Sequence, residues 1–180
     1  MGDTIILVGM MGAGKTTVGR ALADRRGWTH CDSDAQVVAD TGRTVPQLFA
    51  ERGEAAFRAE EARVLAEALS RPGPVVVSAA GGVVLSPANR ELLHRSGTVV
   101  WLRADPELLA RRVGSGAGRP LLGDDPAATL VELYEVRRPL YESVAHIVVD
   151  VDGRSAAQVV DLLLADERLA AVGVGAGGDR

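Results

Sequence analysis

The stretch Gly9-Met10-Met11-Gly12-Ala13-Gly14-Lys15-Thr16 decides the fold of this chain. It follows an apolar run over residues 4–8 and precedes a helical pattern over 17–26, so we expect a strand, a glycine-rich loop and a helix. The spacing is the G-x-x-x-x-G-K-[ST] of a phosphate-binding P-loop. Its glycines let backbone N–H groups curl around a polyphosphate, and the helix N-terminus adds its positive end at the same place. The stretch therefore predicts a nucleotide-binding protein.

Lys15 is the only lysine among the 180 residues, whereas arginine supplies the other long basic side chains. A sequence skewed this far keeps lysine where a compact ammonium on a flexible stem is needed. In a P-loop this lysine reaches the β- and γ-phosphates of the nucleotide, and the next hydroxyl, that of Thr16, binds Mg²⁺. The residues expected to hold the phosphates are Gly12, Ala13, Gly14, Lys15, Thr16 and Thr17.

The bulk composition narrows the class of protein. A net charge of −4 argues against nucleic-acid and membrane partners, and two residues each of Trp, Tyr and Phe are too few for stacking on single-stranded nucleic acid. No apolar run approaches the roughly 18 residues of a membrane span, and the first strand leaves no room for a signal peptide. The single cysteine, Cys31, excludes an intrachain disulfide and fits a reducing cytosol. We therefore expect a cytoplasmic monomer with one domain over residues 1–170 and a disordered tail over 171–180.

Short apolar strands alternate with helices along the rest of the chain. The further strands are expected at 28–32, 75–78, 98–102 and 145–149. The further helices are expected at 36–40, 45–52, 54–70, 87–95, 106–113, 126–141 and 155–169. Five nearly all-apolar, β-branched strands in this alternation predict an α/β fold with a parallel sheet covered on both faces. A glycine-rich segment interrupts the rhythm and is expected to form a mobile lid at about 114–125.

Asp32 and Asp34 stand two residues apart at the carboxyl end of the second expected strand. If the strand continues, both point to one side, at the sheet edge where α/β folds bind ligands. Such carboxylates could bind Mg²⁺ and accept a proton from a substrate hydroxyl, and the alternative is an N-cap pair for the following helix. The strand over 75–78 ends in Ser78, where many P-loop proteins have an aspartate linked to Mg²⁺. Asp32 is therefore the best candidate for the metal.

Arg58 and Arg137 each share a helix face with apolar residues, whereas Arg138 points elsewhere. Each either lies at the rim of its apolar stripe in a structural salt bridge or faces a cleft and binds an anion. Two such arginines, together with an acidic pair and a P-loop, favour a substrate carboxylate or phosphate held bidentately.

Three further features could belong to the site. Gly81 and Gly82 follow a buried strand and would present backbone N–H groups to a ligand, although an ordinary turn has the same pattern. Arg119 lies in the glycine-rich segment, which could carry its charge over the phosphates; the alternative is a merely disordered loop. The three histidines and the cysteine show no metal-ligand spacing, and we assign them to packing or the surface.

Taken together, these motifs resemble the shikimate kinase family, small P-loop kinases of the nucleoside-monophosphate-kinase-like group. The matching pieces, in family order within about 4–165, are 9–17, Asp32-Ser33-Asp34, Thr41-Gly42-Arg43, Gly53-Glu54, F-R-x-E-E at 57–61, Gly81-Gly82, R-P-L-L at 119–122 and R-x-P-L-Y at 137–141. The P-loop alone is generic, but the F-R-x-x-E, R-P-L-L and R-x-P-L-Y motifs together are specific.

The resemblance implies transfer of the γ-phosphate of ATP to the 3-hydroxyl of shikimate, in the pathway to chorismate and the aromatic amino acids. It implies that Asp34 holds the shikimate hydroxyls and assists deprotonation. Arg58 and Arg137 would bind the shikimate carboxylate, and Gly81 and Gly82 would contact its hydroxyls. The family also implies a P-loop kinase fold with sheet order 2-3-1-4-5 and a substrate-binding region at about 33–61.

For the nucleotide, the resemblance implies ATP with Mg²⁺. Lys15 and Arg119 would neutralise the transferring phosphoryl group, and Thr16 with Asp32 would serve the metal. The residues expected beside the adenine are Arg112 and Arg154.

The sequence departs from the family pattern at Ala80, where the first of three glycines is usual, and at Ala156, where a proline is frequent. The methyl group of Ala80 could crowd the substrate or tighten the turn. Two other functions remain possible. A gluconate-type kinase would not need two arginines on one carboxylate, and a non-catalytic nucleotide-binding regulator would be expected to have lost Asp34 or Arg119.

Overall fold

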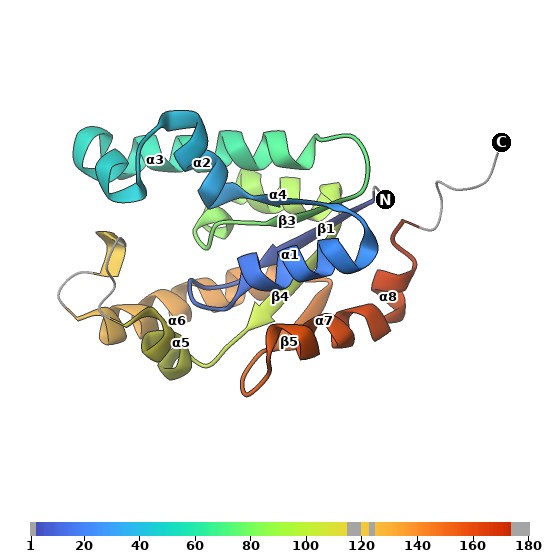
Figure 1. Cartoon of the computed structure of the whole chain (residues 1–180). Helices are drawn as coiled ribbons and strands as arrows, with labels where there is room; N and C mark the ends of the chain where they lie inside the picture. Colours follow the sequence, from blue (N-terminus) through green and yellow to red (C-terminus); the bar gives the residue numbers. More distant parts are fainter. Residues whose placement is uncertain (1–2, 115–119, 123–124, 174–180) are drawn as a thin grey trace.

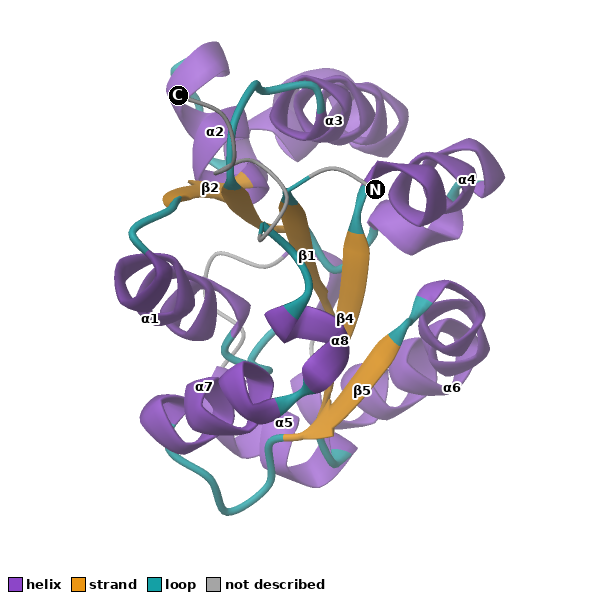
Figure 2. Cartoon of the chain, turned by 90° about the vertical axis from the view of Figure 1, so that its right-hand side faces the viewer, coloured by secondary structure: helices purple, strands orange, loops and turns teal. Residues whose placement is uncertain are grey.

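The structure, a computed structural model, describes residues 3–114, 120–122 and 125–173 (Figure 1). At its centre lies a five-stranded parallel sheet in the order β2-β3-β1-β4-β5 (Figure 2). Its strands are β1 (Thr4–Val8), β2 (Thr29–Asp32), β3 (Val75–Ser78), β4 (Thr98–Arg103) and β5 (Ile147–Asp150). The predicted fold class and the strand order implied by the resemblance are confirmed, and each strand lies within two residues of its predicted bounds.

Helices cover both faces of this sheet. Helices α1 (Lys15–Arg26) and α7 (Ala156–Ala165) lie on one face, and α4 (Pro87–Ser96) and α6 (Pro126–Val144) lie on the other (Figure 2). The central strands β1 and β3 are therefore buried on both sides, which is why they are almost wholly apolar. Past the carboxyl end of the sheet, α2 (Ser33–Thr41) packs against α3 (Val45–Leu69).

Several helices begin at the caps that the sequence indicates. Ser86 accepts a hydrogen bond from the Asn89 backbone N–H at the start of α4, and Asp105 caps α5 (Pro106–Val113) in the same way. The predicted break between the helices at 45–52 and 54–70 is present as well, because Gly53 interrupts α3 with φ +78°. A single turn of 3-10 helix, η1 (Val83–Leu85), follows β3.

The predicted last helix, 155–169, is two helices. Helix α7 ends at Ala165, and α8 (Glu167–Ala170) begins after Asp166, whose backbone is extended (φ −76°, ψ 118°). The Asp166 side chain accepts a hydrogen bond from the Arg168 backbone N–H, and aspartate favours such a cap over a helix interior. Helical periodicity alone does not show this break, because the apolar pattern continues across it.

Ala156 is the first residue of α7 and offers a test of the local backbone. Its predecessor Ser155 is extended (φ −73°, ψ 159°), the conformation that proline requires of the residue before it. Ala156→Pro should raise the free energy of unfolding by about 0.4–1 kcal/mol, because proline restricts the unfolded chain and the first helical N–H has no partner within the helix. Differential scanning calorimetry should show a Tm higher by roughly 1–4 °C. Ala157→Pro is the control. This variant should be less stable than the parent protein, because proline disfavours the helical backbone of the preceding residue, here Ala156. An equal gain in both variants would contradict this account.

Part of the predicted domain plan lies outside the described residues. Most of the predicted lid, including Arg119, lies outside them, and so does the tail after residue 173. In the part of the chain that the structure describes, no helix is long and apolar enough to cross a membrane.

Candidate active site

The P-loop follows β1 and leads directly into α1 at the carboxyl end of the sheet. Gly9 has φ +145°, and a Cβ atom there would lie 2.6 Å from the Leu102 carbonyl oxygen, so this position requires glycine. The Lys15 ammonium donates hydrogen bonds to the carbonyl oxygens of Gly9 at 2.9 Å and Met10 at 3.0 Å. The lysine is thereby folded over the loop, next to the place where the nucleotide phosphates are expected to bind.

The acidic pair lies where β2 ends and α2 begins, so the strand does not continue to Asp34. Asp32 accepts a hydrogen bond from the Thr16 hydroxyl at 2.5 Å and another from the Ala35 backbone N–H at 3.1 Å. Asp32 is therefore the N-cap of α2, and the same side chain contacts Thr16 of the P-loop, while its role toward Mg²⁺ stays a prediction. Asp34 lies in the first turn of α2 and lines a pocket beside Lys15.

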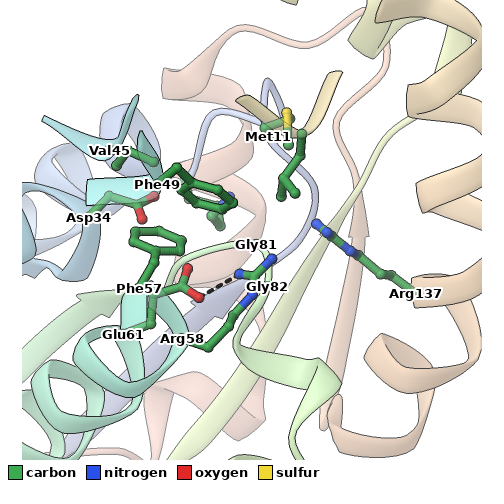
Figure 3. Close-up of a pocket in the computed structure, with 12 residues that line it drawn as sticks. Met11, Asp34, Val45, Phe49, Phe57, Arg58, Glu61, Gly81, Gly82 and Arg137 are labelled. Atoms are coloured by element: carbon green, nitrogen blue, oxygen red, sulfur yellow. Dashed lines mark hydrogen bonds and ion pairs between the residues drawn. The ribbon is translucent and has the colours of Figure 1, made fainter. Parts of the chain in front are cut away.

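This pocket has a volume of about 220 Å³, room for a small molecule, and borders the P-loop. Figure 3 shows Arg58 and Arg137 pointing toward the same space from two different helices, α3 and α6, with Asp34 across from them. The structure thus brings six sequence-predicted residues into one pocket. The lining residues are Met11, Lys15, Asp34, Val45, Phe49, Phe57, Arg58, Glu61, Gly81, Gly82, Leu121 and Arg137.

The two arginines of the pocket have different surroundings. Arg58 pairs with the Glu61 carboxylate and with Glu54, the latter at 3.1 Å. Burial by itself lowers the pKa of Arg58, but these two carboxylates outweigh it and the pKa is raised. Burial raises the pKa of Glu61, whose side chain is only 4% exposed, and Arg58 opposes that rise.

Arg137 is one of the largest fully buried side chains, at 2% exposure. Its Nε atom has no hydrogen-bond partner among the described residues. A buried guanidinium with an unsatisfied donor is costly unless an anion compensates it. An anion in the pocket would supply this compensation, so Arg137 stays a candidate anion-binding residue.

Gly81 and Gly82, from the turn Ala80-Gly81-Gly82, form another wall of the pocket. A Cβ atom on Gly82 would lie 2.0 Å from Arg58 Nη1, so the missing side chain makes room for the guanidinium. The Ala80 methyl group lies in the hydrophobic core, 2% exposed, and Ala80 does not line the pocket. Ala80 is therefore not a wall of this pocket, and its expected effect on the substrate stays a prediction.

A second pocket of about 390 Å³ lies over the P-loop and shares Lys15 and Asp34 with the first. Its wall includes Gly12, Thr16 and Asp32. Beyond it, a third pocket of about 230 Å³ lies between the P-loop and the start of α7. That pocket is lined by Gly12, Ala13, Gly14, Thr17, Val18, Arg112, Val151, Arg154, Ala156 and Val159.

Sequence reasoning gave no role to three residues at the first pocket or beside it. Glu61 lies three residues after Arg58, a spacing that places both on one helix face and could have predicted their pairing. Tyr141 likewise lies four residues after Arg137, and its hydroxyl donates to the Gly81 carbonyl oxygen at 2.7 Å. The Ser33 hydroxyl accepts from the Ala80 backbone N–H at 2.8 Å, and no sequence signal indicates that contact.

Two of the histidines, scattered in sequence, meet on the surface. His94 Nδ1 lies 3.0 Å from His146 Nε2, and His146 Nδ1 accepts a hydrogen bond from the Val99 backbone N–H. His146 must therefore carry its proton on Nε2, and that nitrogen has no lone pair for a metal. This pair is structural, and the described residues contain no group of three or more candidate metal ligands.

Comparison with known proteins gives consistent matches. The family model described as shikimate kinase matches residues 11–167. The shikimate kinase of Burkholderia pseudomallei (strain 1710b) is 45% identical over 93% of this chain and 91% of that protein, and that of Thiobacillus denitrificans is 46% identical over 89% and 88%. The solved structure of shikimate kinase from Acinetobacter baumannii in complex with shikimate is 40% identical, has a TM-score of 0.87 and covers 89% of this chain and 90% of that one. A gluconokinase from Sinorhizobium meliloti is similar in fold alone, at 24% identity and a TM-score of 0.52.

Proposed function

The chain belongs to the shikimate kinase family, and from this premise we propose which of its residues carry the reaction. The enzyme is an ATP-dependent kinase that transfers the γ-phosphate of ATP to the 3-hydroxyl of shikimate and releases ADP. The product enters the biosynthesis of chorismate and the aromatic amino acids. The assignments that follow concern individual side chains, the metal and the lid.

Arg58 and Arg137 bind the shikimate carboxylate. The observation that carries this assignment is the buried Arg137, whose Nε is unsatisfied and whose guanidinium faces the space that Arg58 also faces (Figure 3). A carboxylate between two planar guanidinium groups accepts short, charge-assisted hydrogen bonds from both. Holding the acid end in this way orients the ring toward the P-loop, because Lys15 lines the same pocket.

Asp34 receives the acceptor hydroxyl. It lines both the first pocket, which we call the acceptor pocket, and the second pocket over the P-loop, which we call the phosphate pocket. Lys15 lines both pockets as well. A carboxylate there accepts a hydrogen bond from the substrate hydroxyl and can take its proton as the new phosphate ester forms. Lys15 stabilises the charge on the transferring phosphoryl group, and Arg119 of the R-P-L-L motif adds a second positive charge there.

Thr16 and Asp32 are the residues that would hold Mg²⁺. A hydroxyl already hydrogen-bonded to a carboxylate at the edge of the phosphate pocket fits the metal, which prefers oxygen ligands and keeps several waters and phosphate oxygens. When bound, Mg²⁺ neutralises charge on the β- and γ-phosphates. Arg112 and Arg154 flank the adenine in the third pocket. We further propose that the chain has a lid at about 114–125 and a substrate-binding region at about 33–61. We also propose that the protein is a monomer in the cytoplasm.

The acceptor is tested by ADP release from ATP and Mg²⁺ in three parallel reactions, with shikimate, with gluconate and with no acceptor. Release that depends on shikimate supports the assignment. Release with gluconate alone would keep the kinase reaction but move the substrate. ATP binding without release in any reaction would favour a regulator.

Gly82→Ala tests the packing of the pocket wall. The added methyl group would meet Arg58 Nη1 at 2.0 Å, and the flexible guanidinium must move away from the carboxylate site. The KM for shikimate should rise on the order of ten-fold or more, with little change in Tm, because one charged hydrogen bond is weakened. The control is Gly27→Ala, at the αL end of α1, which lies outside the pocket and has open space for a Cβ, and this variant should lower Tm without changing this KM. An unchanged shikimate KM in Gly82→Ala would contradict the packing argument.

A further inference from the structure

The Ala80-Gly81-Gly82 turn touches both halves of the active site. A Cβ atom on Gly81 would lie 3.3 Å from the carbonyl oxygen of Gly9 in the P-loop, and one on Gly82 would overlap Arg58. The turn therefore sets the distance between the phosphate site and the acceptor site. Two consecutive glycines have more accessible backbone conformations than any other pair, so the sequence of the turn does not by itself fix its shape.

One buried hydroxyl holds this turn from the side of α6. Tyr141 is fully buried, and its ring stacks on Trp101 with centroids 5.8 Å apart. Its hydroxyl donates to the Gly81 carbonyl oxygen at 2.7 Å, and the Met10 sulfur at 3.7 Å is a much weaker acceptor. Because a carbonyl can only accept, the direction of this hydrogen bond is fixed.

The same hydroxyl faces Arg137. Burial raises the pKa of Tyr141, and Arg137 opposes the rise through its charge and as a hydrogen-bond donor. The phenol stays protonated at neutral pH and can therefore donate to Gly81 throughout the reaction. A cation on its oxygen side polarises the O–H bond and strengthens the contact to the turn.

A second buried hydroxyl holds the turn from the side of α2. The Ser33 side chain accepts the Ala80 backbone N–H at 2.8 Å, and Ser33 is 1% exposed. Ser33 is also the residue between Asp32 and Asp34, so the contact joins the acidic segment to the turn. Both groups hold the backbone of the turn and leave its glycine positions open to the pocket.

We propose that the Tyr141 and Ser33 hydroxyls are positioning groups, which hold the Ala80-Gly81-Gly82 turn in the conformation that leaves Arg58 and the glycine backbone placed for the acceptor. Neither hydroxyl lines the acceptor pocket, so neither is a catalytic residue. This inference rests on the proposed roles of Arg58, Gly81 and Gly82 in binding shikimate. When one of the two hydroxyls is removed, the turn populates other conformations. The apparent affinity for shikimate then falls in proportion to the fraction of molecules whose turn keeps the binding conformation.

Tyr141→Phe and Ser33→Ala test the proposal by steady-state kinetics with shikimate and with ATP varied separately. Each variant leaves one buried backbone group of the turn without its partner, and each should raise the shikimate KM about ten-fold. The KM for ATP should change by less than about two-fold, because the P-loop is closed by its own hydrogen bond from the Ala13 backbone N–H to the Met10 carbonyl oxygen at 3.2 Å. The matched control is Tyr134→Phe, which removes a phenol hydroxyl from the same helix, outside the pocket, and should leave both KM values unchanged.

A purely structural role would give a different pattern. A lower Tm in both variants with a shikimate KM within about two-fold of the parent value would overturn the proposal, as would an equal rise in the KM values for shikimate and ATP. If Tyr141→Phe fails to fold, Ser33→Ala decides the same question from the other side of the turn. Absence of shikimate-dependent turnover in the unmodified enzyme would instead reject the proposed function, which the same assay shows before any variant is compared.

Discussion

Lys15→Ala is expected to lower kcat with shikimate on the order of 10³-fold or more, while ATP still binds. Lys15 lines both the acceptor pocket and the phosphate pocket, and we propose that its ammonium stabilises the charge that develops during transfer. The backbone N–H groups of the loop remain to hold the nucleotide, and loss of a preorganised charge is felt chiefly in the transition state. Calorimetric titration with ATP and single-turnover kinetics separate the two effects.

Lys15→Arg should recover little of this activity, because a planar guanidinium does not replace a compact ammonium folded over Gly9 and Met10. Arg20→Ala, on the exposed side of α1, is the matched control for loss of a positive charge and should keep the parent kcat. A Lys15→Ala enzyme with a kcat within about ten-fold of the parent would remove Lys15 from the transition state.

Arg58→Ala and Arg137→Ala should each raise the KM for shikimate roughly 30-fold to several thousand-fold. This corresponds to a loss of about 2–5 kcal/mol of binding free energy. The loss should be larger for Arg137, because this side chain is buried and its truncation leaves the substrate carboxylate desolvated without its partner. Initial rates over a wide range of shikimate concentration, at saturating ATP, measure both values.

Two further variants separate binding from folding. Arg138→Ala removes the neighbouring arginine, an exposed side chain that pairs with Glu142 at 3.4 Å, and should leave the shikimate KM unchanged. Arg58→Ala also leaves Glu61 buried without its cation, and the Arg58→Ala/Glu61→Gln double variant relieves that cost. A shikimate KM that returns to the parent value in the double variant would show that Arg58 serves the fold and not the carboxylate.

Much of the fold could be predicted because the deciding signals are local. The G-x-x-x-x-G-K-[ST] spacing between an apolar strand and a helix is typical of a P-loop, and the caps at Ser86 and Asp105 depend on residues next to them in sequence. The sheet order came from the family resemblance, since strand periodicity does not say which strands are neighbours. The split between α7 and α8 was missed because the Asp166 cap outweighs an apolar pattern that runs on unbroken.

The site was predictable as far as single side chains carry charge or a motif. Arg58, Arg137 and Asp34 drew attention because charged groups near apolar stripes or strand ends need a partner, and the structure places all three on one pocket. Ser33 and Tyr141 could not be found in this way. Their partners are backbone atoms 47 and 60 residues away, and the sequence does not show which backbone groups a fold brings near a hydroxyl.

The proposed binding of the shikimate carboxylate by Arg58 and Arg137 is tested most directly by comparing shikimate with its carboxamide, which keeps the ring and hydroxyls but loses the negative charge. The parent enzyme should prefer shikimate by on the order of a hundred-fold or more in kcat/KM, because the two arginines that line the pocket are proposed to bind the acid. In Arg137→Ala this preference should fall to roughly ten-fold or less, as the interaction that distinguishes the two acceptors is gone. A preference of the same size in Arg137→Ala and in the parent enzyme would show that Arg137 does not bind the carboxylate.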